Sequence, residues 1–461
     1  DELKGSFSSG VNKVASMDIF PVGGAAFWID DVSYDWQELV TPQLNLSALG
    51  VSGIGSLAGI PYSPTAKVRN NGMETISSFD ISFTHDGDAF TQSISDVSLA
   101  PGDYYTVDFE EEFTPAAGPQ SMEVAVSNIN GLDNDDYPED DTYLHMVNLI
   151  QAAAHKRAVI EEGTGTWCQY CPRGAVTMAR MSKMYGSSYI GIAVHNGDPM
   201  AFTEYDSGLG LNAFPGGRAD RGPQLSDGDF ESKWIERMQV APKAIVDLGA
   251  QYNPDTRLLQ VVVDAEMLQN ATGNYKIALV VIEDNVTGTT SGYAQVNAFS
   301  GQNVDMGGYE NLPSVVPASM MVYDHVARAI LPGYGGAGGV LPNPLAEGET
   351  YAINFSTTLA QQWDVDEIVL AAFFIAQNGR IDNAVSFSLA DAIENGWYDS
   401  GNYVVGIQDL PAPDAQIKLY PNPTSNVSYL DIDVKQPDVV KLNISTIDGR
   451  IVAQKNYGIV S

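Results

Sequence analysis

The sequence predicts a multidomain, mainly β protein in which immunoglobulin-like sandwiches flank one α/β domain. Three observations predict this fold class. The chain has 461 residues, enough for roughly three domains or more. Short apolar runs separated by turn residues recur along most of its length. Its only two cysteines, Cys168 and Cys171, lie in the one stretch where strand and helix patterns alternate.

The composition is strongly acidic. Asp and Glu total 58 against 23 Lys and Arg, which gives a formal net charge of −35. Such an excess repels phosphate backbones and anionic lipid headgroups, so we expect no nucleic-acid or membrane-surface partner. We also expect no transmembrane segment, because the sequence has no apolar run of about 18 residues. The chain begins at Asp1 without an initiator Met or a signal peptide, which predicts a mature or truncated form.

The first 44 residues contain one strong β signal. Residues 26–34 read Ala-Phe-Trp-Ile-Asp-Asp-Val-Ser-Tyr, and this ending resembles the last strand of a concanavalin-type jelly roll. Residues 1–44 are too few to build two sheets. We therefore interpret them as the truncated end of such a domain; the alternative is an edge strand that packs on the neighbouring domain.

Residues 45–150 predict an immunoglobulin-like sandwich. Short strands such as 67–70, 79–84 and 122–126 recur at intervals that suit this fold. The order of the Asn-Asn-Gly, Asp-Gly and Leu-x-Pro-Gly turns resembles the bacterial cell-adhesion-related domain. The resemblance implies a module that spaces or presents other domains, and we assign it no chemistry.

An acidic loop at residues 133–141 is a candidate calcium site. Asp133, Asp135 and Asp136 could supply the oxygen ligands that Ca²⁺ prefers. The loop lacks the glycine and the terminal Glu of the helix-loop-helix calcium pattern. A solvated acidic turn between strands is the simpler alternative. Apart from this candidate calcium ion, the sequence requires no cofactor.

The two cysteines lie between a predicted strand, 158–162, and a predicted helix, 175–185. Strand, turn and helix in this order place a thiol at a helix N-terminus, where the helix dipole favours thiolate. A pair spaced Cys-x-x-Cys with no other thiol predicts a redox dithiol or a small local disulfide. A metal site is not expected, because it would need about four ligands.

Further along, a strand at 189–195, the Phe214–Pro215 pair and a helix near 230–238 make residues 151–243 resemble the thioredoxin superfamily. That resemblance implies a cis-proline loop facing the dithiol and a buried carboxylate six residues before the first cysteine. It implies that Cys168 is an exposed nucleophile and that Cys171 is the resolving thiol. It also implies that Glu162 accepts the proton, that Pro215 positions the substrate and that the Trp167 indole shields the site.

Glu161 stands beside Glu162, and on a strand only one of the two is expected to point inward. A half-buried glutamate near a thiol would have a raised pKa. The alternative, that both glutamates lie at a strand end in water, stays open. We expect His195 to be a structural side chain near Asn196 and Asp198, and the Met178–Met184 stripe to be core.

Residues 244–398 return to β patterns, with long apolar runs at 259–264, 275–282 and 368–375 that predict a buried sandwich. Taken with the dithiol and Phe214–Pro215, the motifs at 193–198, 324–328 and 374–384 resemble an outer-membrane-associated lipoprotein family of Bacteroidetes. In that family a thioredoxin-like domain is paired with a β-sandwich. The resemblance implies an extracellular or outer-membrane surface location.

After a linker at 399–415, residues 416–461 resemble the C-terminal sorting domain of type IX secretion. The resemblance rests on Tyr420-Pro421-Asn422-Pro423 and on an expected hairpin turn at 447–450. It implies the type IX secretion machinery as a partner. The family's final Gly-x-Tyr strand is absent, so we expect this sorting domain to be incomplete.

Two functions are compatible with these patterns, and we favour the first, with the second as the alternative. One is a secreted or cell-surface binding or structural protein, with an extracellular protein or polysaccharide as partner, and the number of sandwiches favours it. The other is an extracellular thiol–disulfide oxidoreductase that uses Cys168 and Cys171, and the isolated dithiol favours it. Whether the protein is an enzyme is left undecided by the sequence.

Overall fold

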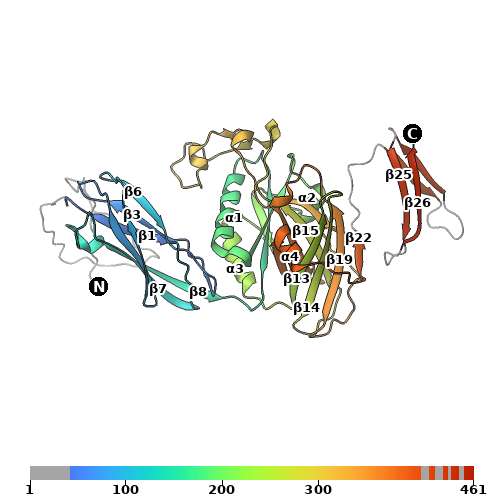
Figure 1. Ribbon diagram of the computed structural model, residues 1–461, viewed down its shortest axis with the longest axis horizontal. Coiled ribbons are helices and arrows are strands. Elements are labelled where there is room, and N and C mark those ends of the chain that lie inside the picture. The colour runs from blue at the N-terminus through green and yellow to red at the C-terminus, as the bar shows by residue number, and fades with distance from the viewer. Residues whose placement is uncertain (1–41, 406–414, 421–428, 435–437, 446–450, 461) are drawn as a thin grey trace, which may run out of the picture. The chain divides into compact units, whose positions relative to one another are not determined.

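The computed structural model describes residues 42–405 and, further on, residues 415–420, 429–434, 438–445 and 451–460 (Figure 1). The chain divides into two compact units, Asp1–Leu149 (unit 1) and Ile150–Ser461 (unit 2). The jelly-roll strand that we predicted within residues 1–44 lies outside the described residues. In the part of the chain that is described, none of the helices combines the length and apolarity needed to cross a lipid bilayer.

Unit 1 is built from two antiparallel sheets. The first has the order β1-β3-β6, and the second has the order β2-β8-β7-β4-β5. Alternate residues of β4 are buried, as the period-two pattern of its sequence predicted. The bounds are β1 Leu46–Ser52, β2 Leu57–Ala58, β3 Thr65–Asn70, β4 Phe79–His85, β5 Asp88–Ile94, β6 Tyr104–Asp108, β7 Gly118–Ser127 and β8 Thr142–Gln151, with the short helix η1 at Pro138–Asp140.

Unit 2 is centred on a mixed eight-stranded sheet with the order β12-β11-β9-β10-β18-β15-β20-β21. The strands β9, β10 and β18 run parallel, and the remaining pairs are antiparallel. The bounds are β9 Ala158–Thr164, β10 Tyr189–His195, β11 Gly216–Ala219, β12 Gln224–Leu225, β15 Lys276–Glu283, β18 Val326–Leu331, β20 Ile368–Ile375 and β21 Ile381–Ser388. Every residue of β9 and β10 is buried, as expected for strands covered on both faces.

Helices cover both faces of this sheet around β9 (Figure 1). The helices α1 (Cys171–Tyr185) and α3 (Phe230–Met238) pack beside β9, and the indole of Trp234 in α3 donates a hydrogen bond to Ala158 O over 2.8 Å. The short helix α2 (Thr203–Leu209) also packs on β9, β10 and β18. The Met178 and Met181 side chains of α1 are buried, whereas Met184 is only partly buried, so the predicted core role of this stripe is confirmed in part.

A second, four-stranded sheet with the order β13-β14-β19-β22 packs against β15, β20 and β21 in one apolar core. Its strands are β13 Ala244–Asn253, β14 Leu258–Met267, β19 Thr350–Thr358 and β22 Tyr403–Val405, and the helix α4, Leu389–Asn395, packs on β13. The predicted separation of residues 151–243 from residues 244–398 is therefore wrong. One sheet takes strands from both segments, because β18 pairs directly with β10.

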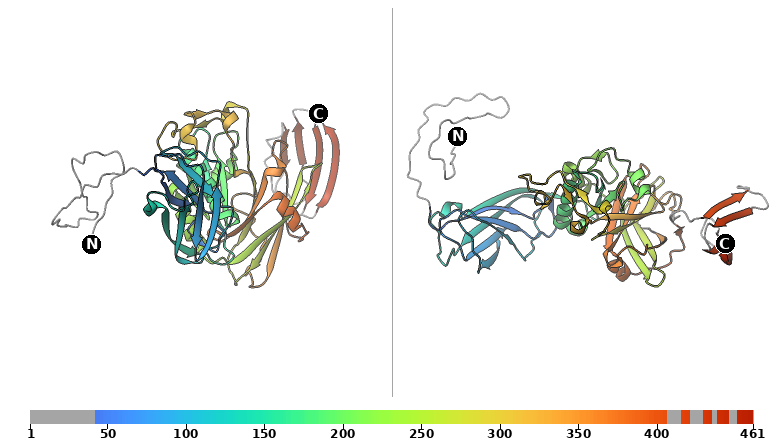
Figure 2. Two further views of the ribbon diagram at one scale, coloured as in Figure 1. Left: turned by 60° about the vertical axis from the view of Figure 1, so that its left-hand side comes forward. Right: turned by 90° about the horizontal axis from the view of Figure 1, so that it is seen from above.

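Between β15 and β18 the chain makes a long excursion, residues 284–325, which we call the cap segment. It contains only short elements, drawn in yellow and gold in Figures 1 and 2. They are η4 Ser291–Tyr293, β16 Gln295–Val296, η5 Tyr309–Asn311, β17 Val315–Val316 and η6 Ala318–Met320. Elsewhere in unit 2, further short helices are η2 Gly186–Ser188, η3 Asp227–Asp229 and η7 Val365–Glu367.

The C-terminal region forms two antiparallel hairpins. The strand β23 (Ala415–Tyr420) pairs with β24 (Tyr429–Val434), and β25 (Asp438–Ser445) pairs with β26 (Ile451–Val460). The turn expected at 447–450 lies outside the described residues.

Candidate functional site

The two cysteines form a disulfide between β9 and α1, with their Cα atoms 5.4 Å apart. The turn is held by its own backbone, since Cys168 N donates to Gly165 O over 3.0 Å and Cys171 N donates to Cys168 O over 3.2 Å. Helix α1 begins at Cys171, directly after Tyr170. The predicted order of strand, thiol turn and helix is confirmed.

The disulfide is buried. Cys168 is 5% exposed and Cys171 is 2% exposed, so the expectation of an exposed nucleophile at Cys168 is wrong. The cap segment packs on the thiol turn and explains this. The amide of Gln295 donates to Cys168 O over 2.9 Å, and Ala298 N donates to Gln169 O over 2.9 Å. These partners lie more than 120 residues away in the sequence, which is why local patterns do not reveal them.

Trp167 and Pro215 lie beside the turn, as the sequence indicated. The Trp167 side chain is 49% exposed, its indole donates to Asn196 O over 2.7 Å, and its ring meets the Phe214 ring edge-on at 5.5 Å between centroids. The Phe214–Pro215 peptide bond is cis. Pro215 reaches helix α1, because a Cβ added at Gly174 would lie 3.1 Å from Pro215 Cβ.

Glu162 is the carboxyl group of the site. Its side chain is fully enclosed, with 1% of the residue exposed, and its Oε1 has no hydrogen-bond partner among the described residues. Burial, and secondarily the negative charge of Asp227, raise the pKa of Glu162 well above its usual value. The raised pKa agrees with the sequence prediction. The degree of burial is greater than the half-burial that we expected.

The neighbouring Glu161 is buried as well, on the other face of β9. Its Oε1 accepts hydrogen bonds from the Tyr205 hydroxyl over 2.7 Å and from Arg221 Nε over 3.2 Å. The expectation that only one of the two glutamates would point inward is wrong, because helices pack on both faces of this strand. The alternative in which both lie in water is wrong for the same reason.

A pocket of about 490 Å³ connects the carboxyl group with the disulfide. Glu162 and Cys171 both line it, together with residues of α1, β10 and the cap segment, among them His195, Gln295, Tyr309 and His325. His195 Nδ1 is 2.7 Å from Asp198 Oδ2, so this histidine lies beside Asp198 as the sequence predicted.

Three residues of the site were missed by the sequence patterns. Asp227 is buried and forms a bidentate ion pair with Arg173 in the first turn of α1, which raises the pKa of Arg173. Gly174 allows helix α1 to lie directly on the Glu162 carboxyl, since a Cβ there would overlap Glu162 Oε1. Gly174 lies just before the helix predicted at 175–185, so the sequence pattern gave no signal for this contact.

The acidic loop belongs to unit 1 and is not part of this site. Asp136 Oδ2 accepts hydrogen bonds from Gln43 N and Leu44 N, and Asp135 Oδ2 accepts one from Leu46 N. Burial and the nearby carboxylates raise the pKa of Asp141 to about 6. Within the described residues, no group of three or more His, Cys, Asp or Glu side chains is arranged to hold a metal ion. Calcium binding through Asp133, Asp135 and Asp136 stays a prediction, which thermal unfolding with and without a chelator can test.

Fold and site together define a mainly β, multidomain protein with a buried disulfide at the start of a helix. Residues 203–390 match the family described as outer membrane protein Omp28. The matched segment runs from α2 to the first residues of α4, so it includes Pro215 but neither the cysteine pair nor Glu162. The family description agrees with the predicted location at an extracellular or outer-membrane surface.

No curated protein matches the chain. Among solved structures, a domain of a putative cell surface protein from Methanosarcina acetivorans is 21% identical, covers 23% of this chain and 92% of its own, and has a TM-score of 0.21. A protein from Agrobacterium tumefaciens is 16% identical over 52% of this chain and 96% of its own, with a TM-score of 0.30. The CARDB domain of a Pyrococcus furiosus protein in complex with di-metal ions is 16% identical and has a TM-score of 0.20. The match covers 26% of this chain and 100% of that domain. Likenesses at such TM-scores carry no functional argument.

Proposed function

We propose that this chain is a cell-surface or outer-membrane protein whose central domain is thioredoxin-like and exchanges the Cys168–Cys171 disulfide with thiols of an extracellular client protein. The observation that carries the proposal is the buried, unpaired carboxyl of Glu162, which lines the same pocket as Cys171. An enclosed carboxyl group without a partner costs free energy of folding. Groups of this kind with shifted pKa values are concentrated at functional sites.

The exchange step follows from the roles of the two sulfurs. A client thiolate attacks Cys168 Sγ, the Cys168–Cys171 bond breaks, and Cys171 leaves as a thiolate while a mixed disulfide forms at Cys168. A second client thiol then attacks the client sulfur of that mixed disulfide and releases Cys168. The client loses two electrons and the protein gains them, and the same path in reverse reduces a client disulfide.

Glu162 suits the proton transfer in this step. Because burial raises its pKa, the carboxyl carries a proton that it can give to the Cys171 thiolate as that group leaves. In the reverse direction the carboxylate accepts the proton from Cys171. Glu162 therefore acts as the acid or the base for the resolving thiol.

Access to Cys168 requires movement of its surroundings, since the residue is 5% exposed. The nearby cap segment is made of short elements, and its hydrogen bonds to the thiol turn are few. Segments of this kind open locally at a lower free energy than core strands. We expect the exchange rate to depend on this opening.

The experiment is a disulfide-reduction assay with insulin as the client, dithiothreitol as the electron donor, and wild type compared with Cys168→Ser. We expect the wild type to accelerate precipitation of the insulin chains and the variant to be inactive. In Glu162→Gln, the rate should fall about 10²-fold or more at neutral pH, because an acid–base group contributes about 10²- to 10⁴-fold. Equal behaviour of wild type and Cys168→Ser would contradict the proposal.

The second candidate is a binding or structural protein in which the disulfide is only a local cross-link. The observation that favours it is the burial of both cysteines beneath the cap segment. In that case the free energy of unfolding should fall when the disulfide is reduced, and no client should be turned over. Its partner would be an extracellular protein or polysaccharide.

We further propose export by the type IX secretion machinery. Support comes from the Tyr420-Pro421-Asn422-Pro423 motif and from the two hairpins, β23–β24 and β25–β26, in the segment where a small β-rich sorting domain was expected. A reporter fused to residues 416–461 should reach the surface of a bacterium that has this machinery. It should stay inside the outer membrane when the machinery is deleted.

A further inference from the structure

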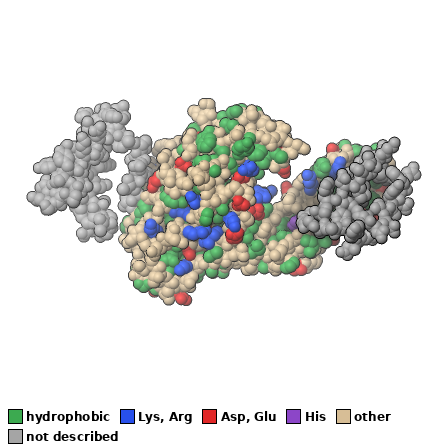
Figure 3. Space-filling model, turned by 180° about the vertical axis from the view of Figure 1, so that it is seen from behind, with side chains coloured by type: hydrophobic (Ala, Val, Ile, Leu, Met, Phe, Trp, Pro, Cys, Tyr) green, Lys and Arg blue, Asp and Glu red, His purple; other side chains and the backbone are tan. Residues whose placement is uncertain are grey.

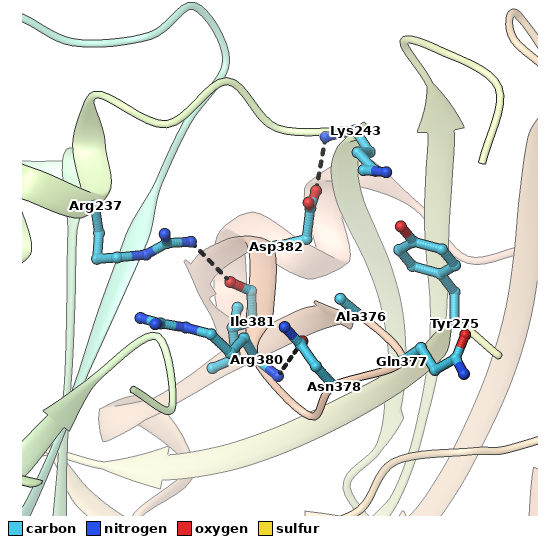
Figure 4. Close-up of a pocket in the computed structure, with 9 residues that line it drawn as sticks. All are labelled: Arg237, Lys243, Tyr275, Ala376, Gln377, Asn378, Arg380, Ile381 and Asp382. Atoms are coloured by element: carbon cyan, nitrogen blue, oxygen red, sulfur yellow. Dashed lines mark hydrogen bonds between the residues drawn. The ribbon is translucent and has the colours of Figure 1, made fainter. Parts of the chain in front are cut away.

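A second pocket in unit 2 is rich in cationic side chains, although the chain as a whole has a net charge of −35. Figure 3 shows Lys and Arg side chains gathered over part of the surface of this unit. The pocket has a volume of about 590 Å³ and lies where the end of α3, the start of β13 and the β20–β21 turn meet (Figure 4). Its cationic side chains are Arg237, Lys243 and Arg380, and Asp382 is its one carboxylate.

Behind the pocket, the buried carboxylate of Asp220 forms ion pairs with Lys156 and with the pocket residue Arg237. Its Oδ2 is 2.7 Å from Lys156 Nζ and 2.8 Å from Arg237 Nε, and its Oδ1 accepts a hydrogen bond from Val159 N over 2.9 Å. The side chains of Asp220 and Lys156 are fully buried, so neither can turn toward a ligand. Arg237 is thus oriented by Asp220 at the border of the pocket.

Asp382 is also engaged. Its Oδ2 accepts a hydrogen bond from Lys243 N over 2.7 Å, as Figure 4 shows. The Lys243 ammonium itself has no carboxylate within ion-pair distance in the described part of the chain, and it lies 5.8 Å from the centre of the Tyr275 ring. Asp382 therefore accepts a hydrogen bond from the backbone of Lys243 and attracts the Lys243 ammonium only at a distance longer than that of an ion pair.

Arg380 has no carboxylate partner among the described residues either. Its guanidinium donates one long hydrogen bond, 3.3 Å, to Ala219 O, and its buried Nε has no hydrogen-bond partner. Burial, and then the positive charge of Arg237, lower the pKa of Arg380. The negative charge of Asp220 opposes this shift, but Asp220 forms no ion pair with Arg380.

Four cations, Lys156, Arg237, Lys243 and Arg380, thus face two carboxylates, Asp220 and Asp382, which leaves an excess of about two positive charges. We propose that this pocket binds a doubly charged oxyanion, a phosphate or sulfate group carried by an extracellular molecule. The group would lie between Arg380 and Lys243, with Arg237 at its side. This proposal does not depend on the exchange activity of the disulfide.

Neutral donors around the pocket suit the same ligand. The Tyr275 hydroxyl has no hydrogen-bond partner among the described residues, and in Figure 4 it points toward the interior of the pocket. The side-chain amides of Gln377 and Asn378 lie at the rim, on the exposed β20–β21 turn. Arginine guanidinium groups with added neutral donors are a typical recognition set for tetrahedral oxyanions.

The distant acidic residues do not prevent binding at physiological ionic strength. Exposed charges are screened beyond a Debye length of about 8 Å at 0.15 M salt, whereas groups inside a pocket are screened much less. The cations next to the ligand therefore dominate its electrostatic energy. At low salt, the overall negative charge would oppose the approach of the anion.

The test is a calorimetric titration of the full chain with inorganic phosphate, with sulfate and acetate in parallel, at a constant ionic strength of about 0.15 M. We expect phosphate or sulfate to bind with a dissociation constant on the order of 1 mM, and acetate to bind several-fold more weakly because it has one charge. The preference between phosphate and sulfate identifies the group that the natural ligand carries.

The variants are Arg380→Gln and Lys243→Gln, each of which removes one pocket cation without breaking an ion pair. Each should weaken phosphate or sulfate binding about tenfold, the loss of one charge-assisted contact. Lys233→Gln is the matched control, because Lys233 lies on the same α3 helix and pairs with Glu236 outside the pocket. Unchanged binding in both pocket variants, an equal loss in the control, acetate binding as tight as phosphate, or no binding by the wild type would each overturn the proposal.

Discussion

The two faces of strand β9 give adjacent glutamates opposite surroundings. Glu161 points to the α2 face, where it meets the Arg221 guanidinium and the Tyr205 hydroxyl. Glu162 points to the α1 face, where it meets Gly174 and the pocket behind Cys171, and no cation of the described residues pairs with it. Both side chains are almost completely buried.

This difference shows that burial alone does not define the chemistry of a carboxyl group. Next to Arg221, which also stacks on the Tyr334 ring at 3.8 Å, Glu161 is half of a structural ion pair. Without a cation, and with Asp227 nearby, Glu162 has a raised pKa and can hold a proton. The first arrangement joins β9 to Arg221 through an ion pair, and the second is suited to proton exchange with a thiol.

The largest effect should come from breaking the ion pair between Glu161 and Arg221. Glu161→Gln leaves the buried Arg221 without its counter-charge, and we expect the free energy of unfolding of unit 2 to fall by about 3–5 kcal/mol. Glu162→Gln is the matched change on the other face and should cost far less near pH 5. Chemical denaturation of both variants measures the difference. Equal losses would mean that the two faces are energetically alike.

An intermediate effect should come from the contact between α1 and Glu162. In Gly174→Ala the new methyl group overlaps the carboxyl and crowds Pro215, so we expect a loss of about 1–3 kcal/mol despite the better helix propensity of alanine. Ser182→Ala in the same helix should change the stability by less than about 0.5 kcal/mol. If Gly174→Ala were neutral or stabilising in denaturation, the close approach of helix and carboxyl would be wrong.

The smallest effect should be a pH dependence of the free energy of unfolding, which comes from Glu162. The folded-state pKa of Glu162 is raised, so its contribution to stability is fully present below the unfolded-state pKa of about 4.5. It is lost as the pH rises toward the folded-state pKa, because the unfolded chain ionises first. Wild type should therefore lose stability relative to Glu162→Gln as the pH is raised from about 4. Parallel stability curves for the two proteins would show that Glu162 has an ordinary pKa.

Much of the local structure could be predicted. The strands at 189–195 and 368–375 and the helix at 230–238 coincide with β10, β20 and α3, because long, strongly periodic segments carry their own signal. Helix α1 begins four residues earlier than expected, at Cys171 rather than Ala175, since the Cys-Pro pair forms its first turn. The seven-residue helix α2 was not among the elements that the sequence predicted.

Part of the site was predictable, but Asp227, Arg173 and Gly174 were missed, and so was the burial of the disulfide. The spacing of Cys168, Cys171 and Pro215 and the position of Glu162 could be read from the sequence. The covering of the thiol turn by Gln295 and the sharing of one sheet between residues 151–243 and 244–398 could not. These are contacts between segments more than a hundred residues apart, and no local periodicity records them.

By itself, the sequence determined that this protein is acidic and mainly β, and that its one thiol pair stands between a strand and a helix. Only the tertiary structure decided that Glu161 has a cationic partner, whereas Glu162 has none among the described residues. It also decided that three cationic side chains meet in one pocket. The physical reason is that propensity and periodicity act over neighbouring residues. Burial, pKa shifts and charge clusters depend instead on which distant segments pack together.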